Sequence, residues 1–334
     1  MGFLSYFTKT LAIILAITTF IIIISTFINL TNLNEENFFK LVEGKKDSKN
    51  VIAILEINGA IIDGTHNNLR INVNSFIFPE IINDKLANLK NYNPKILIVK
   101  INSPGGTVSA SSQLHKFFED YKKNNNVKLI FFTNQLLTSG GYWVATAGDN
   151  IFASYGSIIG SIGVSGPNWF FYNKPTSISN GLFGQSIDTQ KGIEVFSQNS
   201  GLSKDLYNPF RKPSIEEMNH LQSISDQIYS DFINQVSKSR KIEESFIKNQ
   251  IGAQIFNTKQ AKYNYLIDDE IYFADLIKSL IKENKYFEYK IIKNNQNKKF
   301  IDNFFSNNSE TTLDICKFLI SNYISMLPLH LDKC

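Results

Sequence analysis

The sequence predicts an α/β fold that is built on a parallel sheet and preceded by one membrane-spanning helix. Between residues 51 and 134, short apolar runs alternate with stretches of helical spacing, and two of these runs lead into glycine turns. Strands that alternate with helices are typical of parallel sheets joined by right-handed crossovers. A third observation is the run of twenty residues without a charge at positions 11–30.

This apolar segment, 11–30, is long enough to cross roughly 30 Å of hydrocarbon as a helix. Lys9 precedes it and two glutamates follow it, so the positive-inside rule places residues 1–10 in the cytoplasm and the body across the membrane. A cleavable signal peptide is the alternative, but the stretch TFINLTN supplies no convincing small-x-small cleavage site. We therefore expect a retained anchor, followed by a polar linker at residues 31–50.

The folded body should contain three parallel strands joined by helices. The apolar runs that predict these strands lie at 51–59, 95–106 and 127–134, and the helices between them are expected at 79–92 and from Val108 onward. Catalytic groups of such sheets lie at the carboxyl ends of the strands. The glycine turns at 103–106 and 139–141 are therefore expected to lie together.

The second half of the chain is less regular. Residues 158–164 form a compact apolar segment with two glycines, and an irregular stretch follows up to about residue 198. A helix should begin after Ser214, which forms a capping box with Glu217, and its buried stripe is expected to contain Met218, Leu221, Ile228 and Phe232. A strand-and-helix unit at 252–272 closes the body. We expect the main domain at 51–284 and a tail at 285–334 that is partly helical.

Composition excludes several classes of protein. The net charge of +4 is spread along the chain, and only 19% of the residues are charged, which argues against a nucleic-acid-binding protein. Both cysteines, Cys316 and Cys334, lie in the tail, and no cysteine or histidine spacing is typical of zinc. We therefore expect no metal and no cofactor.

Ser139 is the most informative residue, because two glycines and then an apolar helical pattern follow it directly. The first N–H groups of a helix are unpaired and carry partial positive charge, so a serine there lies beside donors that could hold an oxyanion. An ordinary glycine turn capped by serine is the alternative interpretation. The residues around Ser139 have to decide between the two.

A serine nucleophile needs a group that takes its proton. None of the four histidines, His66, His115, His220 and His330, lies in a recognisable catalytic setting, and Leu137 occupies the first glycine position of a GxSxG elbow. The alternative base is a lysine whose pKa is lowered by desolvation. Lys204 lies among a glycine and two prolines at 199–217, although composition alone favours a surface lysine.

Five segments, in this order, resemble the signal peptide peptidase A family (peptidase family S49) of membrane-anchored Ser/Lys peptidases: VIAILEING, INSPGG, TSGGYWVATAGD, IIGSIGV and SGLSKDLYNPFRKPSIEE. The resemblance runs from about residue 51 to residue 272. It implies a ClpP/crotonase-like fold with repeated β-β-α and βαβ units, in which Ser139 is the nucleophile and Lys204 the general base. It also implies that Ser161 orients the lysine amine, and that N–H groups of Gly105 or Gly106 and of Gly140 form the oxyanion hole.

The same resemblance implies the biological setting. Relatives degrade cleaved signal peptides and other apolar peptides on the extracytoplasmic side of the bacterial cytoplasmic membrane, as homo-oligomers of about eight protomers. Whether Ser139 and Lys204 of one site come from one protomer or from two neighbours stays open. Two other functions also stay open: a ClpP-like membrane protease of the stomatin-partner type, and an inactive oligomeric membrane scaffold with a solvated Lys204.

Overall fold

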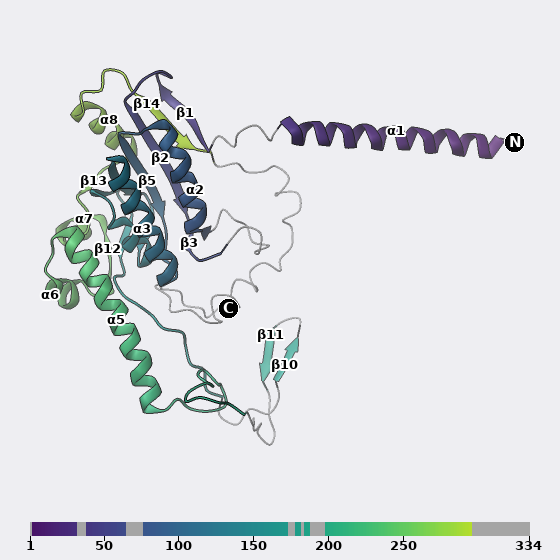
Figure 1. Cartoon of the computed structure of the whole chain (residues 1–334). Helices are drawn as coiled ribbons and strands as arrows, with labels where there is room; N and C mark the ends of the chain where they lie inside the picture. The colour runs from purple at the N-terminus through teal and green to yellow at the C-terminus, as the bar shows by residue number, and fades with distance from the viewer. Residues whose placement is uncertain are drawn as a thin grey trace.

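A computed structural model describes residues 2–31, 38–64, 76–172, 178–181, 184–187 and 198–295 of the chain. The N-terminal helix α1 (Gly2–Thr31) stands apart from the sheet, as Figure 1 shows. Its segment Tyr6–Ser25 has a mean hydropathy of 2.3, so α1 is long and apolar enough to cross a membrane. The predicted apolar helix at 11–30 is thus confirmed as a helix.

The described residues form a seven-stranded main sheet with the order β1-β14-β2-β5-β6-β8-β13. Its strands are β1 (Phe39–Gly44), β2 (Val51–Asn58), β5 (Ile96–Asn102), β6 (Lys128–Thr133), β8 (Asn150–Ala153), β13 (Asp269–Glu270) and β14 (Lys290–Asn294). Every neighbouring pair is parallel except β1 with β14, which is antiparallel. The predicted α/β class and the three predicted strands are therefore confirmed.

Both faces of the central strands of the main sheet are buried. Successive side chains of a strand point to opposite faces, and in β2 Ala53 and Leu55 belong to one apolar cluster while Ile52 and Ile54 belong to the other. The first cluster is covered by α2 (Pro79–Leu89), α3 (Val108–Asn125), α4 (Gly140–Ala145) and α5 (Ile215–Arg240), and the second by α8 (Phe273–Glu283). Burial on both faces explains why the strands read as continuous apolar runs.

A second, three-stranded sheet with the order β12-β9-β7 lies beside the carboxyl end of β5. Its strands are β7 (Leu136–Thr138), β9 (Ile158–Gly160) and β12 (Ile255–Asn257). A bridge joins Ser103, just after β5, to Leu137 in β7, and the N–H of Thr138 donates to the carbonyl of Ser103 at 3.2 Å. This small sheet is what brings the two glycine turns together.

The remaining elements are short. They are β3 (Ala60–Ile61), β4 (Phe76–Ile77), the single turns Lys90–Tyr92 and Ile247–Ile251, α6 (Glu244–Phe246), α7 (Thr258–Tyr263) and the hairpin of β10 (Ile178–Gly181) with β11 (Gly184–Ile187). The closing unit predicted at 252–272 corresponds to β12, α7 and β13.

Two strands of the main sheet lie outside the range 51–284 that was predicted for the main domain. β1 lies in the expected linker, and β14 lies beyond the expected end of the domain at residue 284. β1 is an edge strand in which only Phe39 is buried, so its sequence carries little apolar signal. β14 joins the sheet by pairing with β2, a partner far away in the sequence. The main sheet therefore contains strands from residue 39 to residue 294.

Helix α5 begins as predicted, with the capping box of Ser214 and Glu217, but its buried stripe is shifted towards its C-terminal half. Phe232 is buried, together with Ile233 and Val236, whereas Met218 is 47% exposed. The predicted stripe was therefore wrong in its first turns, because the N-terminal half of α5 extends beyond the sheet (Figure 1). The predicted tail from residue 296 onward, which contains both cysteines and His330, lies outside the described residues, as does His66.

Candidate active site

Ser139 occupies a strained turn between β7 and α4. Its backbone angles are φ 56° and ψ −127°, a region that residues other than glycine rarely adopt. Two hydrogen bonds hold the turn: the N–H of Ser139 donates to the carbonyl of Gly160 at 2.8 Å, and the N–H of Trp143 donates to the carbonyl of Ser139 at 3.0 Å. A serine on a strained strand-to-helix turn is the backbone arrangement that presents a nucleophilic hydroxyl in other hydrolases.

The Ser139 hydroxyl is buried and makes no hydrogen bond within the described part of the chain. The residue is 1% exposed, and among the described residues its Oγ has no hydrogen-bond partner. Leaving a buried hydroxyl unpaired costs about 1–3 kcal/mol. Unsatisfied polar groups of this kind are rare in folded proteins, and a catalytic role is one of the reasons for which they are retained.

Glycine N–H groups lie beside this serine. A Cβ added to Gly140 would lie 3.2 Å from the N atom of Gly106, and one added to Gly141 would lie 3.0 Å from the Cβ of Ser103. The two glycine turns thus lie together, as the parallel-sheet argument predicted. The N–H of Gly105 already donates to Ser103 Oγ at 3.1 Å. Among the described residues the N–H groups of Gly106 and Gly140 have no acceptor, so they can stabilise an oxyanion.

Ser161 follows Gly160 and therefore lies one residue beyond the carbonyl that holds Ser139. It is 8% exposed and has φ 53°, and its N–H donates to the carbonyl of Gln254 at 2.7 Å. This bond joins the end of β9 to the residues just before β12. The turn at Ser161 is thus fixed on both sides, near the Ser139 turn.

Lys204 lies elsewhere in the single chain. It is exposed, in a turn in which its N–H donates to the carbonyl of Gly201 at 3.3 Å. Since Ser139 Oγ has no partner among the described residues, the Lys204 amine is not hydrogen-bonded to it within one chain. Eleven residues after Lys204 the chain begins α5, whose first turns project away from the sheet in Figure 1. The fold therefore groups Ser139, Ser161, Gly106 and Gly140 and leaves Lys204 apart.

An ion-pair cluster orders the loop that carries Lys204. The Arg211 guanidinium donates to the Asp205 carboxylate at 2.7 and 2.8 Å and to the Glu217 carboxylate at 2.7 and 2.8 Å. These hydrogen bonds lower the pKa of Asp205, and those from Arg211, with that from the Ser214 N–H, lower the pKa of Glu217 to about 2. Glu217 also caps α5. Arg211 therefore connects Asp205, the residue next to Lys204, to the start of that helix. Arg211 was not among the site residues predicted from the sequence, although it lies in one of the five segments that resemble the family.

The segment after Ser161 also forms hydrogen bonds to the loop that carries Lys204. The indole N–H of Trp169 donates to the carbonyl of Asn208 at 3.1 Å, and the N–H of Tyr172 donates to the carbonyl of Pro209 at 2.7 Å. The guanidinium of Arg211 lies over the Trp169 ring, 5.2 Å from its centroid. The segment that follows Ser161 therefore packs against the loop that carries Lys204.

Neither of the two described histidines is hydrogen-bonded to Ser139. His115, on α3, is buried and hydrogen-bonded to the side-chain amide of Gln235 at 2.9 Å, and burial lowers the pKa of its imidazole. His220 is exposed on α5. Neither ring contacts Ser139 Oγ, which has no partner in the described part of the chain.

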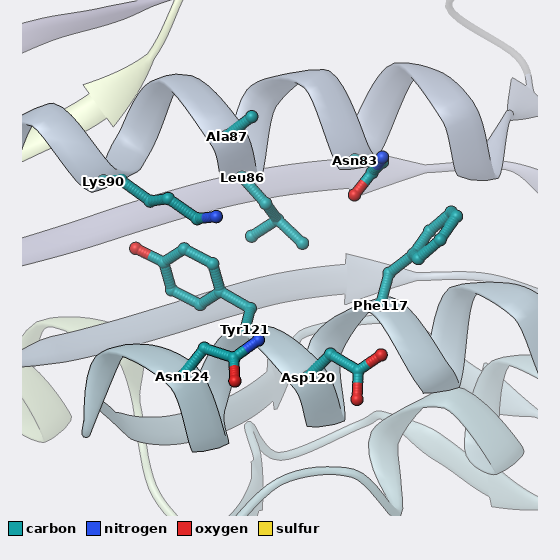
Figure 2. A pocket seen from close by; sticks show the side chains of 8 residues that line it. All are labelled: Asn83, Leu86, Ala87, Lys90, Phe117, Asp120, Tyr121 and Asn124. Atoms are coloured by element: carbon teal, nitrogen blue, oxygen red, sulfur yellow. The ribbon is translucent and has the colours of Figure 1, made fainter.

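A cavity of about 260 Å³ lies between α2 and α3 (Figure 2). Its walls combine apolar side chains such as Leu86 and Phe117 with Lys90 and Asp120, and the Tyr121 ring faces it. None of the predicted site residues lines it. The candidate catalytic residues lie outside this cavity, where the main sheet meets the three-stranded sheet.

Comparisons with known proteins identify the family. The model of peptidase family S49 matches residues 121–286. A protein of Enterococcus faecium named signal peptide peptidase SppA is 30% identical over 265 residues, which cover 78% of this chain and 70% of that protein. Protease 4 of Haemophilus influenzae is 26% identical over 66% of this chain, but the match covers only 32% of protease 4.

Solved structures with ClpP-like folds are among the structural neighbours of the chain. A membrane-bound stomatin-specific protease in complex with a substrate peptide is 14% identical, with a TM-score of 0.43, over 78% of this chain and 97% of that one. ClpP1 from Listeria monocytogenes is 12% identical, with a TM-score of 0.41, over 66% of this chain and 92% of that one. By the sequence matches, this chain belongs to peptidase family S49, a family of serine proteases.

Proposed function

We propose that this chain is a membrane-anchored endopeptidase in which Ser139 is the nucleophile and Lys204 of a neighbouring protomer is the general base. The observation that carries the proposal is the Ser139 turn: a strained, buried serine with an unpaired hydroxyl next to the N–H groups of Gly106 and Gly140. Lys204 is separate from this turn within one chain, which favours completion of the site by a second protomer.

The proposed reaction is acyl transfer to serine. Neutral Lys204 accepts the proton of the Ser139 hydroxyl, and Ser139 Oγ attacks the carbonyl carbon of the scissile peptide bond. The N–H groups of Gly106 and Gly140 stabilise the oxyanion, and the lysine passes the proton to the leaving amine. Water then hydrolyses the acyl-enzyme. Ser161 Oγ accepts a hydrogen bond from an N–H of the neutral lysine amine and so leaves the amine lone pair directed towards Ser139.

The substrates that we propose are cleaved signal peptides and similar apolar segments. Support comes from helix α1, which is apolar enough to anchor the enzyme at a bilayer in which such peptides are released, and from the similarity to the Enterococcus faecium protein. We place the catalytic domain on the extracytoplasmic side of the bacterial cytoplasmic membrane, since Lys9 precedes α1's apolar core and glutamates follow it. The assembly is a homo-oligomer of about eight protomers, a number that the resemblance to the family supplies.

The test is complementation between two inactive variants. Ser139→Ala and Lys204→Ala should each abolish cleavage of an apolar signal-peptide substrate. Co-expressed full-length Ser139→Ala and Lys204→Ala chains should recover part of the wild-type rate, because some interfaces then pair an intact serine with an intact lysine. Full activity of Ser139→Ala alone would overturn the proposal. If the mixture is inactive although both variants assemble normally, the site is completed within one chain.

A further inference from the structure

A second buried serine hydroxyl lies in the same region as Ser139. Ser111, in the first turns of α3, is fully buried, and among the described residues its Oγ has no hydrogen-bond partner. A Cβ added to Gly140 would lie 2.2 Å from Ser111 Oγ and 3.2 Å from the N atom of Gly106. The Ser111 hydroxyl therefore occupies the space beside Gly140 that a side chain there would fill, next to both candidate oxyanion donors.

A serine hydroxyl inside a helix usually has a hydrogen-bond partner, and the Ser111 hydroxyl has none among the described residues. A serine inside a helix can hydrogen-bond to the carbonyl four residues earlier, which for Ser111 is that of Thr107. That carbonyl accepts the Ser111 N–H at 3.0 Å, but the hydroxyl has no acceptor there. An alanine would fit the same close approach of α3 to α4 without burying an unpaired polar group. Packing alone therefore does not explain why the residue is a serine.

We propose that the Ser111 hydroxyl is a third hydrogen-bond donor of the oxyanion site. This inference rests on the proposed peptidase function. When Ser139 Oγ bonds to the substrate carbonyl carbon, the carbonyl oxygen gains negative charge. The Ser111 O–H then donates to this oxygen together with the N–H groups of Gly106 and Gly140. Ser111 keeps its proton and forms no covalent bond.

The unpaired state of the hydroxyl before the reaction fits this role. A donor that is already bonded in the resting enzyme has to break that bond before it can serve the transition state, whereas an unpaired donor needs no reorganisation. The same feature predicts an opposite effect on folding, because removing an unpaired buried hydroxyl relieves its desolvation cost. The variant that loses activity should thus keep or gain stability.

The decisive variant is Ser111→Ala, made in the full-length chain and compared with the wild type and with Ser112→Ala. Ser112 is the exposed neighbour on α3 and provides the matched control. We expect Ser111→Ala to lower kcat for an apolar peptide by about 10²–10³-fold, as for other oxyanion donors, with little change in KM and an unchanged or higher thermal unfolding midpoint. Ser112→Ala should match the wild type in all three quantities.

The other outcomes overturn the inference. An unchanged kcat in Ser111→Ala means that Ser111 is only a small spacer between α3 and α4. A drop in the unfolding midpoint that accompanies the loss of kcat means that the hydroxyl stabilises the fold. Ser139→Ala, assayed in parallel, separates these failures from failure of the proposed function. If Ser139→Ala is inactive while Ser111→Ala is fully active, only the role of Ser111 is wrong.

Discussion

The N–H of Ser139 donates to the carbonyl of Gly160 at 2.8 Å, and this bond joins the serine turn to the strand that leads into Ser161. Gly160 is suited to this position because its φ is 117° and because a Cβ there would lie 2.6 Å from the backbone carbonyl oxygen of Gln254. The conformation of the serine turn thus depends on a glycine twenty-one residues later in the sequence.

Gly160→Ala should impair both folding and activity. The added Cβ meets a backbone atom that cannot rotate away, and the positive φ is itself strained, so we expect a loss of about 3 kcal/mol in the free energy of unfolding. Gly156→Ala is the control, because Gly156 also has a positive φ of 87° but no atom within 4 Å of an added Cβ. It should lose only about 1 kcal/mol. Equal losses in the two variants, measured by thermal or urea unfolding, would contradict the importance of the contact with Gln254.

Tyr142→Phe should destabilise the helix that follows Ser139. The Tyr142 hydroxyl is buried and donates to the carbonyl of Leu266 at 2.8 Å. Its loss leaves that carbonyl unpaired and should cost about 1–3 kcal/mol of unfolding free energy. Tyr263→Phe serves as the control, since Tyr263 is 82% exposed. A Tyr142→Phe variant as stable as Tyr263→Phe would show that the bond contributes nothing.

Arg211→Lys should lower the transition-state stabilisation measured by kcat/KM more than it lowers the free energy of unfolding. Lysine keeps the charge but cannot donate paired hydrogen bonds to Asp205 and Glu217 at once. The loop that carries Lys204 then loses its connection to the start of α5, and we expect kcat/KM to fall about tenfold, which corresponds to about 1.4 kcal/mol of transition-state stabilisation. Lys262→Gln, which breaks a surface ion pair with Asp269, is the control. Wild-type kinetics in Arg211→Lys would separate the cluster from catalysis.

The same cluster predicts how stability depends on pH. The folded pKa of Glu217 is about 2, below its ordinary value of 4.5, so its contribution to stability is fully present above pH 4.5. This contribution should be lost as the pH falls from about 4.5 towards 2, where the folded carboxylate becomes protonated. The thermal midpoints of the wild type and of Glu217→Gln should therefore differ most above pH 4.5 and converge below it. A difference that grows on acidification would contradict the ion pairs with Arg211.

The sequence was informative where a signal is local. Continuous apolar runs predicted β2, β5 and β6, and the pair of Ser214 with Glu217 predicted the start of α5. It was uninformative where pairing with a distant segment creates the element: β14 becomes a strand through β2, and β1 is a strand only beside β14. The buried stripe of α5 was misplaced for the same reason, because which turns of a helix are buried depends on where the sheet ends.

In the candidate site, too, local signals could be predicted from the sequence, whereas contacts between distant segments could not. The sequence by itself determined that Ser139 begins a helix after an apolar strand, since glycines and helical spacing are local signals, and it placed the chain in its peptidase family. Only the tertiary structure decided that Gly106, rather than Gly105, has the unpaired N–H, that Ser111 lies against Gly140, and that Lys204 is separate from Ser139 within one chain. These relationships depend on which hydrogen bonds are already made and which backbones approach closely, and both are fixed only when the two sheets and α3 pack together.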